Sequence, residues 1–169
     1  KGTALTTNLE NSYLRVNALR RWGDKFKVKF HLHFDGEFKL NLSRNVQLIE
    51  GTGGHNHSVI GENLRVRKYL TTPKDNLPFD ALISVRYSVR ERMGRWIEKK
   101  AKSSMFPKNW DITRVKQEIA LVYDDMVESG YTLRFENNKW RRLVSNKQFE
   151  ILIEVDKQGN ITNAYPLKK

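Results

Sequence analysis

Residues 111–130, DITRVKQEIALVYDDMVESG, separate two parts of the chain that have different hydrophobic patterns. Apolar residues recur here every three or four positions, which is the period of an amphipathic helix. Either Asn109 or Asp111 is a suitable N-cap for this helix, and Gly130 is a suitable stop. The apolar positions of the predicted helix are Ile112, Val115, Ile119, Val122 and Met126.

The chain that follows this helix consists of short β-rich runs separated by turns. These runs predict a meander of antiparallel strands that closes the sequence. The predicted strands are residues 131–135, 140–144, 149–155 and 161–165, with a turn at residues 156–160.

Upstream of the helix, residues 25–34, KFKVKFHLHF, alternate strictly between polar and apolar side chains. A period of two predicts a β-strand. One face of this strand would carry three lysines together with His31 and His33. The other face would carry Phe26, Val28, Phe30, Leu32 and Phe34.

The remaining elements follow from similar patterns. Leu9, Tyr13, Val16 and Leu19 have helical spacing, so residues 7–21 predict an amphipathic helix that ends near Gly23. Between the strand at residues 25–34 and the helix at residues 111–130, turn residues and β-rich runs alternate. We expect there a turn at Asp35-Gly36, extended chain at 38–49, a loop with Gly51, Gly53 and Gly54, a loop at 73–78, a strand at 81–89, its hairpin partner at 95–98 across Met93-Gly94, and a basic loop at 99–107.

These elements predict an α+β fold with antiparallel sheets. A chain of 169 residues is long enough to bury a core and short enough for one domain. We therefore predict a single domain, residues 1–169, with an N-terminal helical segment at residues 1–24 and a core at residues 25–169.

The charge is strongly unbalanced, with 31 Lys and Arg against 19 Asp and Glu and a net charge of +12. Such a chain attracts polyanions, and RNA or DNA fits better than a membrane because no long apolar run or lipidation signal is present. Cysteine is absent, which excludes disulfides, thiolate nucleophiles and Cys-ligated zinc. We expect basic residues such as Arg86 and Arg95 to lie on a solvated face. The core and base-stacking platforms are both possible places for the tryptophans Trp96, Trp110 and Trp140.

All four histidines of the chain, His31, His33, His55 and His57, fall within 27 residues of each other and end in the stretch GGHNHS, residues 53–58. Three interpretations are open: solvated surface, a metal site, or the acid and base of a reaction. Two histidines and one lysine suffice for RNA cleavage by the RNA's own 2′-hydroxyl, which needs a base, an acid and a cation. That chemistry needs no metal or other cofactor.

Four stretches taken in order are similar to those of the EndoU endoribonuclease family: HLHFDGEF at residues 31–38, GGHNHS at residues 53–58, KKAKSSMFPKNWD at residues 99–111 and ITNAYP at residues 161–166. The resemblance spans residues 31–166. It implies antiparallel sheets around a catalytic cleft and cleavage of RNA to a 2′,3′-cyclic phosphate and a 5′-hydroxyl, with no metal.

The resemblance also implies roles for individual residues. His31 or His33 matches the family's first histidine, and His55 matches the second, with His57 as its rival. Lys99, Lys100 and Lys102 all lie near the expected position of the lysine. The implied catalytic residues are His31, His33, His55, Lys99, Lys100 and Tyr165, and the implied substrate-binding residues are His57, Lys102, Ser103, Ser104, Thr162 and Asn163.

Bacterial members of this family often form the toxin end of large surface-delivered proteins, including contact-dependent growth inhibition effectors of the CdiA type. The chain begins without an initiator Met, and we expect a fragment of such an exported or cell-surface protein, a monomer that acts in the cytoplasm of a target cell. The resemblance implies RNA, and tRNA in particular, as the substrate, and a cognate immunity protein as the partner. An acidic immunity protein would complement the charge of +12.

Two other functions compete with an endoribonuclease. A non-catalytic RNA-binding module would bind RNA in a salt-sensitive way and form no product. A metal-dependent nuclease that uses the histidine cluster would hold stoichiometric metal at neutral pH.

Overall fold

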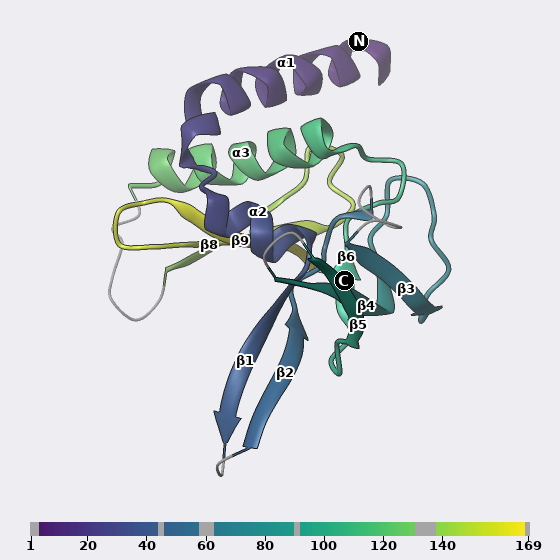
Figure 1. The fold of residues 1–169 in the computed structure, drawn as a ribbon. Helices are drawn as coiled ribbons and strands as arrows, with labels where there is room; N and C mark the ends of the chain where they lie inside the picture. Colours follow the sequence, from purple (N-terminus) through teal and green to yellow (C-terminus); the bar gives the residue numbers. More distant parts are fainter. Residues whose placement is uncertain (1–3, 44–45, 58–62, 90–91, 131–137, 168–169) are drawn as a thin grey trace. The chain divides into compact units, whose positions relative to one another are not determined.

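The computed structural model is an α+β structure, as predicted (Figure 1). Its backbone divides into two compact units, which are residues 28–110 and residues 1–27 together with 111–169. The single domain of residues 1–169 stays a prediction. The structure describes residues 4–43, 46–57, 63–89, 92–130 and 138–167.

The unit formed by residues 1–27 and 111–169 packs two helices with a three-stranded antiparallel sheet. In the sheet β8 lies between β7 and β9, and Ile153 of β8 pairs with Trp140 on one side and Ala164 on the other. α3 contacts β7 and β8, and α1 packs against α3. The elements are α1 (Ala4–Trp22), the 3₁₀ turn η1 (Gly23–Lys25), α3 (Ile112–Glu128), β7 (Lys139–Leu143), β8 (Glu150–Val155) and β9 (Ile161–Leu167).

α3 confirms the helix predicted after residue 110, including its ends. The Asp111 carboxylate accepts a hydrogen bond of 2.7 Å from the backbone N–H of Arg114, which identifies Asp111 as the N-cap. The helix ends at Glu128, and Gly130 adopts a φ of +73°. The apolar positions at helical spacing from Val115 to Met126 are buried.

α1 confirms the helix predicted at residues 7–21, but its buried face differs from the prediction. Tyr13 and Val16 are exposed by 68% and 40%. Ala18 packs with Ala120 and Leu121 of α3, and Leu19 joins this cluster. Polar contacts fix the rest of α1, because Asn11 donates to the Ser145 carbonyl at 3.1 Å and Arg15 lies 3.6 Å from the Glu118 carboxylate.

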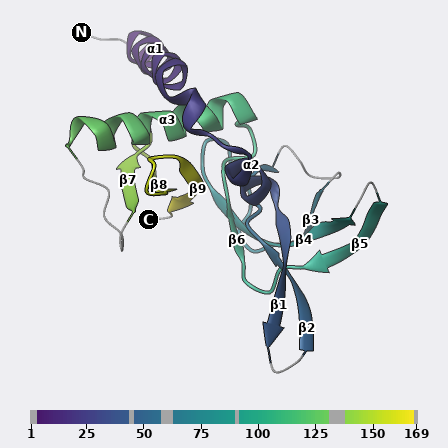
Figure 2. The same cartoon turned by 60° about the vertical axis from the view of Figure 1, so that its left-hand side comes forward.

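The unit formed by residues 28–110 is built on the long strand β4. β3 pairs with one edge of β4, while β5 and β6 pair with different parts of the other edge. β1 and β2 form a separate antiparallel hairpin that projects from α2 (Figure 2). The elements are α2 (Val28–Asp35), β1 (Glu37–Ser43), β2 (Val46–Thr52), β3 (Leu64–Tyr69), β4 (Phe79–Val89), β5 (Arg92–Glu98) and β6 (Ser103–Met105).

The strand predicted at residues 25–34 is wrong, because Val28–Asp35 forms α2. Phe30 and Phe34 are fully buried, whereas Val28 and Leu32 are exposed by 73% and 55%. A strand would bury all four side chains on one face, but a helix buries only residues four apart. The alternating stretch thus also contains a period of four, through Phe26, Phe30 and Phe34, and tertiary packing selects the helix.

Two smaller predictions also change. β5 begins at Arg92, so Met93-Gly94 lies inside the strand and is not the hairpin turn. The predicted basic loop contains β6, in which Ser103 pairs with Ala81. The strand predicted at residues 131–135 lies outside the described residues. β3 was not predicted, whereas the extended chain at 38–49 and the strands at 140–144, 149–155 and 161–165 are confirmed.

In the part of the chain that the structure describes, no helix combines the length and the apolar character that a membrane crossing needs.

The helical burial pattern of α2 can be tested with two substitutions. We expect Phe34→Ala to lower the free energy of unfolding by about 3–5 kcal/mol, because it empties a fully buried position. Leu32→Ala should change it by less than about 0.5 kcal/mol, because this side chain is exposed. Urea unfolding measures both values, and equal losses for the two variants would contradict the helix.

Candidate active site

The loop of Gly53 and Gly54 lies directly against the C-terminal end of α2. The Gly54 N–H donates to the His33 carbonyl at 3.0 Å, and the His55 N–H donates to the Phe34 carbonyl at 2.8 Å. Both glycines have positive φ, of +68° and +77°. These two backbone hydrogen bonds hold the chain around His55 beside the chain around His33.

Only glycine fits at these two positions. A Cβ atom on Gly53 would lie 1.8 Å from the His33 carbonyl oxygen, and one on Gly54 would lie 2.3 Å from Cδ1 of Ile83. The pair therefore permits two close approaches, one to α2 and one to β4. This is why a Gly-Gly pair precedes His55.

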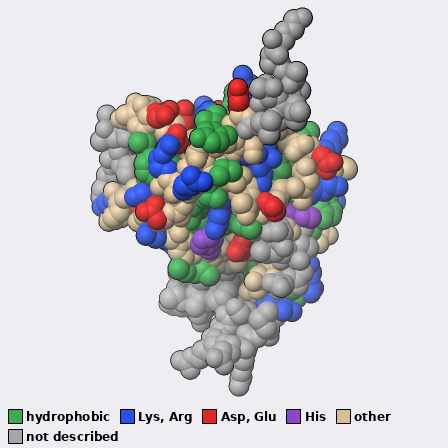
Figure 3. Space-filling view, turned by 90° about the horizontal axis from the view of Figure 1, so that it is seen from above, with side chains coloured by type: hydrophobic (Ala, Val, Ile, Leu, Met, Phe, Trp, Pro, Cys, Tyr) green, Lys and Arg blue, Asp and Glu red, His purple; other side chains and the backbone are tan. Residues whose placement is uncertain are grey.

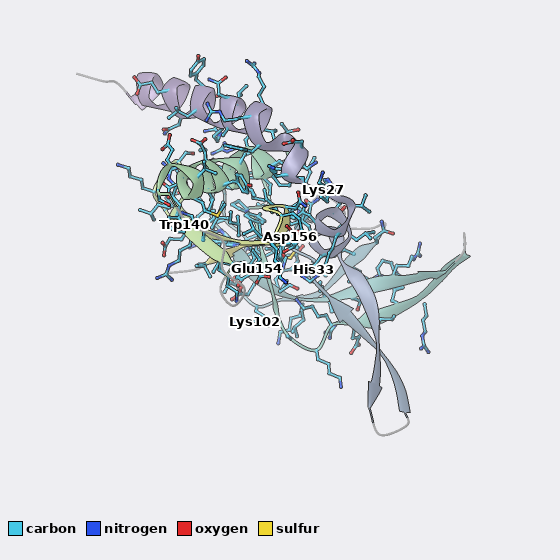
Figure 4. All side chains as sticks on the ribbon, turned by 90° about the vertical axis from the view of Figure 1, so that its left-hand side faces the viewer. Lys27, His33, Lys102, Trp140, Glu154 and Asp156 are labelled. Atoms are coloured by element: carbon cyan, nitrogen blue, oxygen red, sulfur yellow. The ribbon has the colours of Figure 1, made fainter. Side chains whose placement is uncertain are left out.

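His33 and His55 come together in the structure, and His31 does not join them. The ring centroids of His33 and His55 are 6.3 Å apart. Residues two apart on a helix point about 200° apart, so α2 turns His31 away from His33. The His31 ring contacts Phe30 at a centroid distance of 5.5 Å. Figure 4 shows His33 on α2.

His55 is 6% exposed, and its ring is fixed by a backbone carbonyl. Its Nδ1 lies 2.6 Å from the Ser104 oxygen of β6. A carbonyl oxygen only accepts, so Nδ1 carries the proton and Nε2 of the neutral ring carries none. The pKa of His55 is lowered to about 3. Burial is the largest cause, the Ser104 hydrogen bond acts in the opposite direction, and the charges of Lys99 and His33 add to the lowering.

Lys99 is tied to the same loop. Its ammonium donates to the Gly53 carbonyl at 3.0 Å and to the Ser103 hydroxyl at 2.8 Å. The Ser103 hydroxyl in turn donates to the Gly53 carbonyl at 3.0 Å, and Ser103 is fully buried. Burial lowers the pKa of Lys99. An ammonium has three N–H groups, so one remains after these two hydrogen bonds.

The other candidates in residues 28–110 have different neighbours. Lys100 is exposed. Lys102, seen in Figure 4, lies 3.4 Å from the Asp80 carboxylate. The His57 ring contacts Phe79 at a centroid distance of 5.6 Å, and burial, then the charge of Lys108, lowers its pKa. In Figure 3, histidine side chains reach the visible surface among Lys and Arg side chains.

Tyr165, Thr162 and Asn163 belong to β9, in the other unit. Tyr165 pairs with Leu152 of β8 and is half-buried, and burial, followed by the charge of Glu154, raises its pKa. The Thr162 hydroxyl donates to the Glu154 carbonyl at 3.2 Å. The Asn163 side-chain oxygen accepts from the Ala164 N–H at 2.9 Å.

Sequence reasoning missed a polar clamp next to the histidines. The buried Asn56 donates from Nδ2 to the Asp35 carboxylate at 3.0 Å, which ties the residue after His55 to the last residue of α2. The asparagine between two histidines was the available signal. Among the residues that the structure describes, no cluster of three or more His, Cys, Asp or Glu could hold a metal ion.

The close approach at Gly53 can be measured through stability. Gly53→Ala introduces both left-handed strain and a clash with the His33 carbonyl, so we expect a loss in the free energy of unfolding of more than about 3 kcal/mol. Gly130→Ala is the matched control, because its φ is +73° but, among the described residues other than its chain neighbours, no atom lies within 4 Å of the added Cβ. We expect it to cost about 1–2 kcal/mol. Equal costs by thermal or urea unfolding would contradict the contact.

Comparison with known proteins gives one match. A family model described as bacterial EndoU nuclease matches residues 34–168. This range includes His55, Lys99, Ser103 and Tyr165, and it begins one residue after His33. No curated protein and no solved structure matches the chain significantly.

Proposed function

Because this chain belongs to the bacterial EndoU nuclease family, it is an endoribonuclease, and we propose that His33, His55 and Lys99 carry out its reaction. The observation that carries this proposal is the pair of histidine rings 6.3 Å apart, of which one is held neutral. The lysine belongs to the same group because it donates to the Gly53 carbonyl, two residues before His55.

The proposed reaction is attack of an RNA 2′-hydroxyl on the neighbouring phosphorus. A bond forms between O2′ and phosphorus while the bond between phosphorus and O5′ breaks. The O2′ proton passes to Nε2 of His55, and a proton from His33 passes to the departing O5′. The products are a 2′,3′-cyclic phosphate and a 5′-hydroxyl, and DNA is not cleaved because it lacks the nucleophile.

The tautomer of His55 supports its role as the base. With Nδ1–H donated to the Ser104 carbonyl, Nε2 is the atom that can accept a proton. A ring with a pKa of about 3 is unprotonated at neutral pH. A bound phosphodiester would add a negative charge beside the ring and raise its pKa, which would strengthen the base when substrate is present.

Lys99 is suited to stabilise the charge that develops on the phosphate oxygens. Its side chain is held by the Gly53 carbonyl and the Ser103 hydroxyl, so the ammonium is positioned before substrate binds. Ser103, which the resemblance assigned to nucleotide binding, is fully buried, and its hydroxyl accepts from Lys99 and donates to the Gly53 carbonyl. We assign it to positioning Lys99, and within residues 28–110 we leave nucleotide contacts to Ser104 and His57.

We further propose that the substrate is tRNA and that the chain is the toxin end of a contact-dependent growth inhibition effector. The support is the family membership together with the net charge of +12, which favours a polyanionic substrate and an acidic immunity protein. Such a domain would be exported as part of a larger protein and act in the cytoplasm of the target cell.

Incubation of the purified chain with total bacterial RNA in excess chelator tests this proposal. We expect tRNA fragments with 2′,3′-cyclic phosphate and 5′-hydroxyl ends. His55→Asn should lower the rate roughly 10²–10⁴-fold, because the asparagine Nδ2 can still donate to the Ser104 carbonyl but no base remains. RNA binding and the unfolding midpoint of this variant should stay close to those of the original chain.

The two histidines of α2 provide the matched comparison. His33→Ala should lower the rate roughly 10²–10⁴-fold, and His31→Ala by less than about tenfold. The reverse order would contradict the assignment of the acid. Cleavage that stops in chelator would favour a metal-dependent reaction, and cleavage of a substrate with 2′-deoxyribose at the scissile position would rule out the internal nucleophile.

A further inference from the structure

One tryptophan in residues 28–110, Trp96, lies against two arginines. The guanidinium carbon of Arg65 lies 4.0 Å from the centroid of the Trp96 ring, and that of Arg86 lies 4.9 Å from it. The three residues come from β3, β4 and β5, which lie side by side, and Arg86 pairs directly with Trp96. The sheet therefore fixes the spacing of all three side chains.

This stack lies on the face of the sheet opposite to the histidines. Ile83 and Val85 of β4 are fully buried, and the Gly53–Gly54 loop approaches Ile83. Side chains alternate along a strand, so Arg86 points to the other face. Arg65 pairs with Ser84 and is on that same face. Trp96 and Arg86 are half-buried, while Arg65 is exposed.

A neighbouring arginine shows how a structural arginine behaves in this sheet. Arg67 donates to the Ile83 carbonyl at 3.2 Å and to the Lys99 carbonyl at 3.0 Å, and it lies 3.8 Å from the Glu98 carboxylate. Among the described residues, Arg65 and Arg86 instead stack on Trp96, and Nε of Arg86 is buried without a hydrogen-bond acceptor. The Trp96 ring holds both planar groups, and Arg65 is exposed, so a ligand can reach its N–H groups.

Guanidinium groups held in this way fit phosphate. A stacked guanidinium is fixed in orientation and can donate two parallel hydrogen bonds to one phosphate group. The Trp96 ring adds an aromatic edge that a nucleobase can contact. A chain of net charge +12 that cleaves RNA meets one such ligand in repeated form, the RNA backbone.

We propose that Arg65, Trp96 and Arg86 form a second RNA-binding surface, which holds backbone phosphates outside the scissile dinucleotide. Trp96 lies three residues before Lys99, or about 10 Å along an extended strand. An RNA of several nucleotides that passes the edge of the sheet reaches both sites. This surface would make the chain bind long RNA more tightly than short fragments. The proposal rests on the proposed function only in placing the scissile dinucleotide at His33 and His55.

Salt-dependent binding tests this surface without relying on cleavage. All variants carry His55→Asn, and fluorescence anisotropy follows a single-stranded RNA of about 20 nucleotides at several salt concentrations. We expect Arg65→Gln with Arg86→Gln to weaken binding roughly 10- to 100-fold. The slope of log K against log salt should fall by about 1.4, which is about 0.7 for each lost phosphate contact to a single strand.

The control removes two exposed arginines of the other unit, Arg20 and Arg141, and so changes the net charge equally. Arg20→Gln with Arg141→Gln should weaken binding less than about threefold and leave the slope unchanged. Arg65→Gln alone changes an exposed side chain and should give half the change in slope. This single variant tests the surface even if the variant that includes Arg86→Gln fails to fold.

Equal effects of the two double variants would overturn the proposal, because binding would then depend on net charge alone. The proposal would also be overturned if Arg65→Gln with Arg86→Gln weakened the binding of a dinucleotide as much as that of the long RNA. A dinucleotide should occupy only the site at His33 and His55. None of these readouts depends on whether the chain cleaves tRNA.

Discussion

The approach of the Gly53–Gly54 backbone to the last turn of α2 is the contact on which the site depends. It places a backbone N–H against the His33 carbonyl at 3.0 Å, where any side chain on Gly53 would collide. The same glycine offers its own carbonyl to Lys99 and to Ser103. One short loop thereby brings together the histidine of a helix, the histidine that follows the loop, and the lysine that follows β5. Removing the approach would separate all three.

Burial then determines the chemistry of the group. Because His55 is almost fully enclosed, its charged form is disfavoured and its pKa falls to about 3. The Ser104 carbonyl selects which nitrogen keeps the proton. Burial lowers the pKa of Lys99, and the positive charge of Lys99 lowers the pKa of His55. The arrangement produces a neutral base beside a cation, which is the combination needed at a phosphodiester.

The sequence predicted the elements that local patterns control. α3 has seventeen residues with a helical period and a capping aspartate, and the strands of the last sheet are short β-rich runs between turns. α2 was missed because its alternating stretch also satisfies a period of four, and only the burial of Phe30 and Phe34 separates the two. That error affected the site as well. A strand would have put His31 and His33 on one face, whereas the helix puts only His33 beside His55. The burial of Ser103 was also beyond the sequence, since it depends on the pairing of β6 with β4.

The proposed reaction depends on a neutral His55 ring with its proton on Nδ1, and ¹⁵N NMR of the imidazole reports both properties. A histidine whose folded pKa is depressed stays neutral as the pH falls through 6.5, its usual value, and protonates only near the folded pKa of about 3. We predict for the free protein a neutral ring from pH 8 to pH 5, with a proton on Nδ1 and none on Nε2. A ring that titrates with a pKa near 6.5, or a neutral ring protonated on Nε2, would show that His55 is not held as the base.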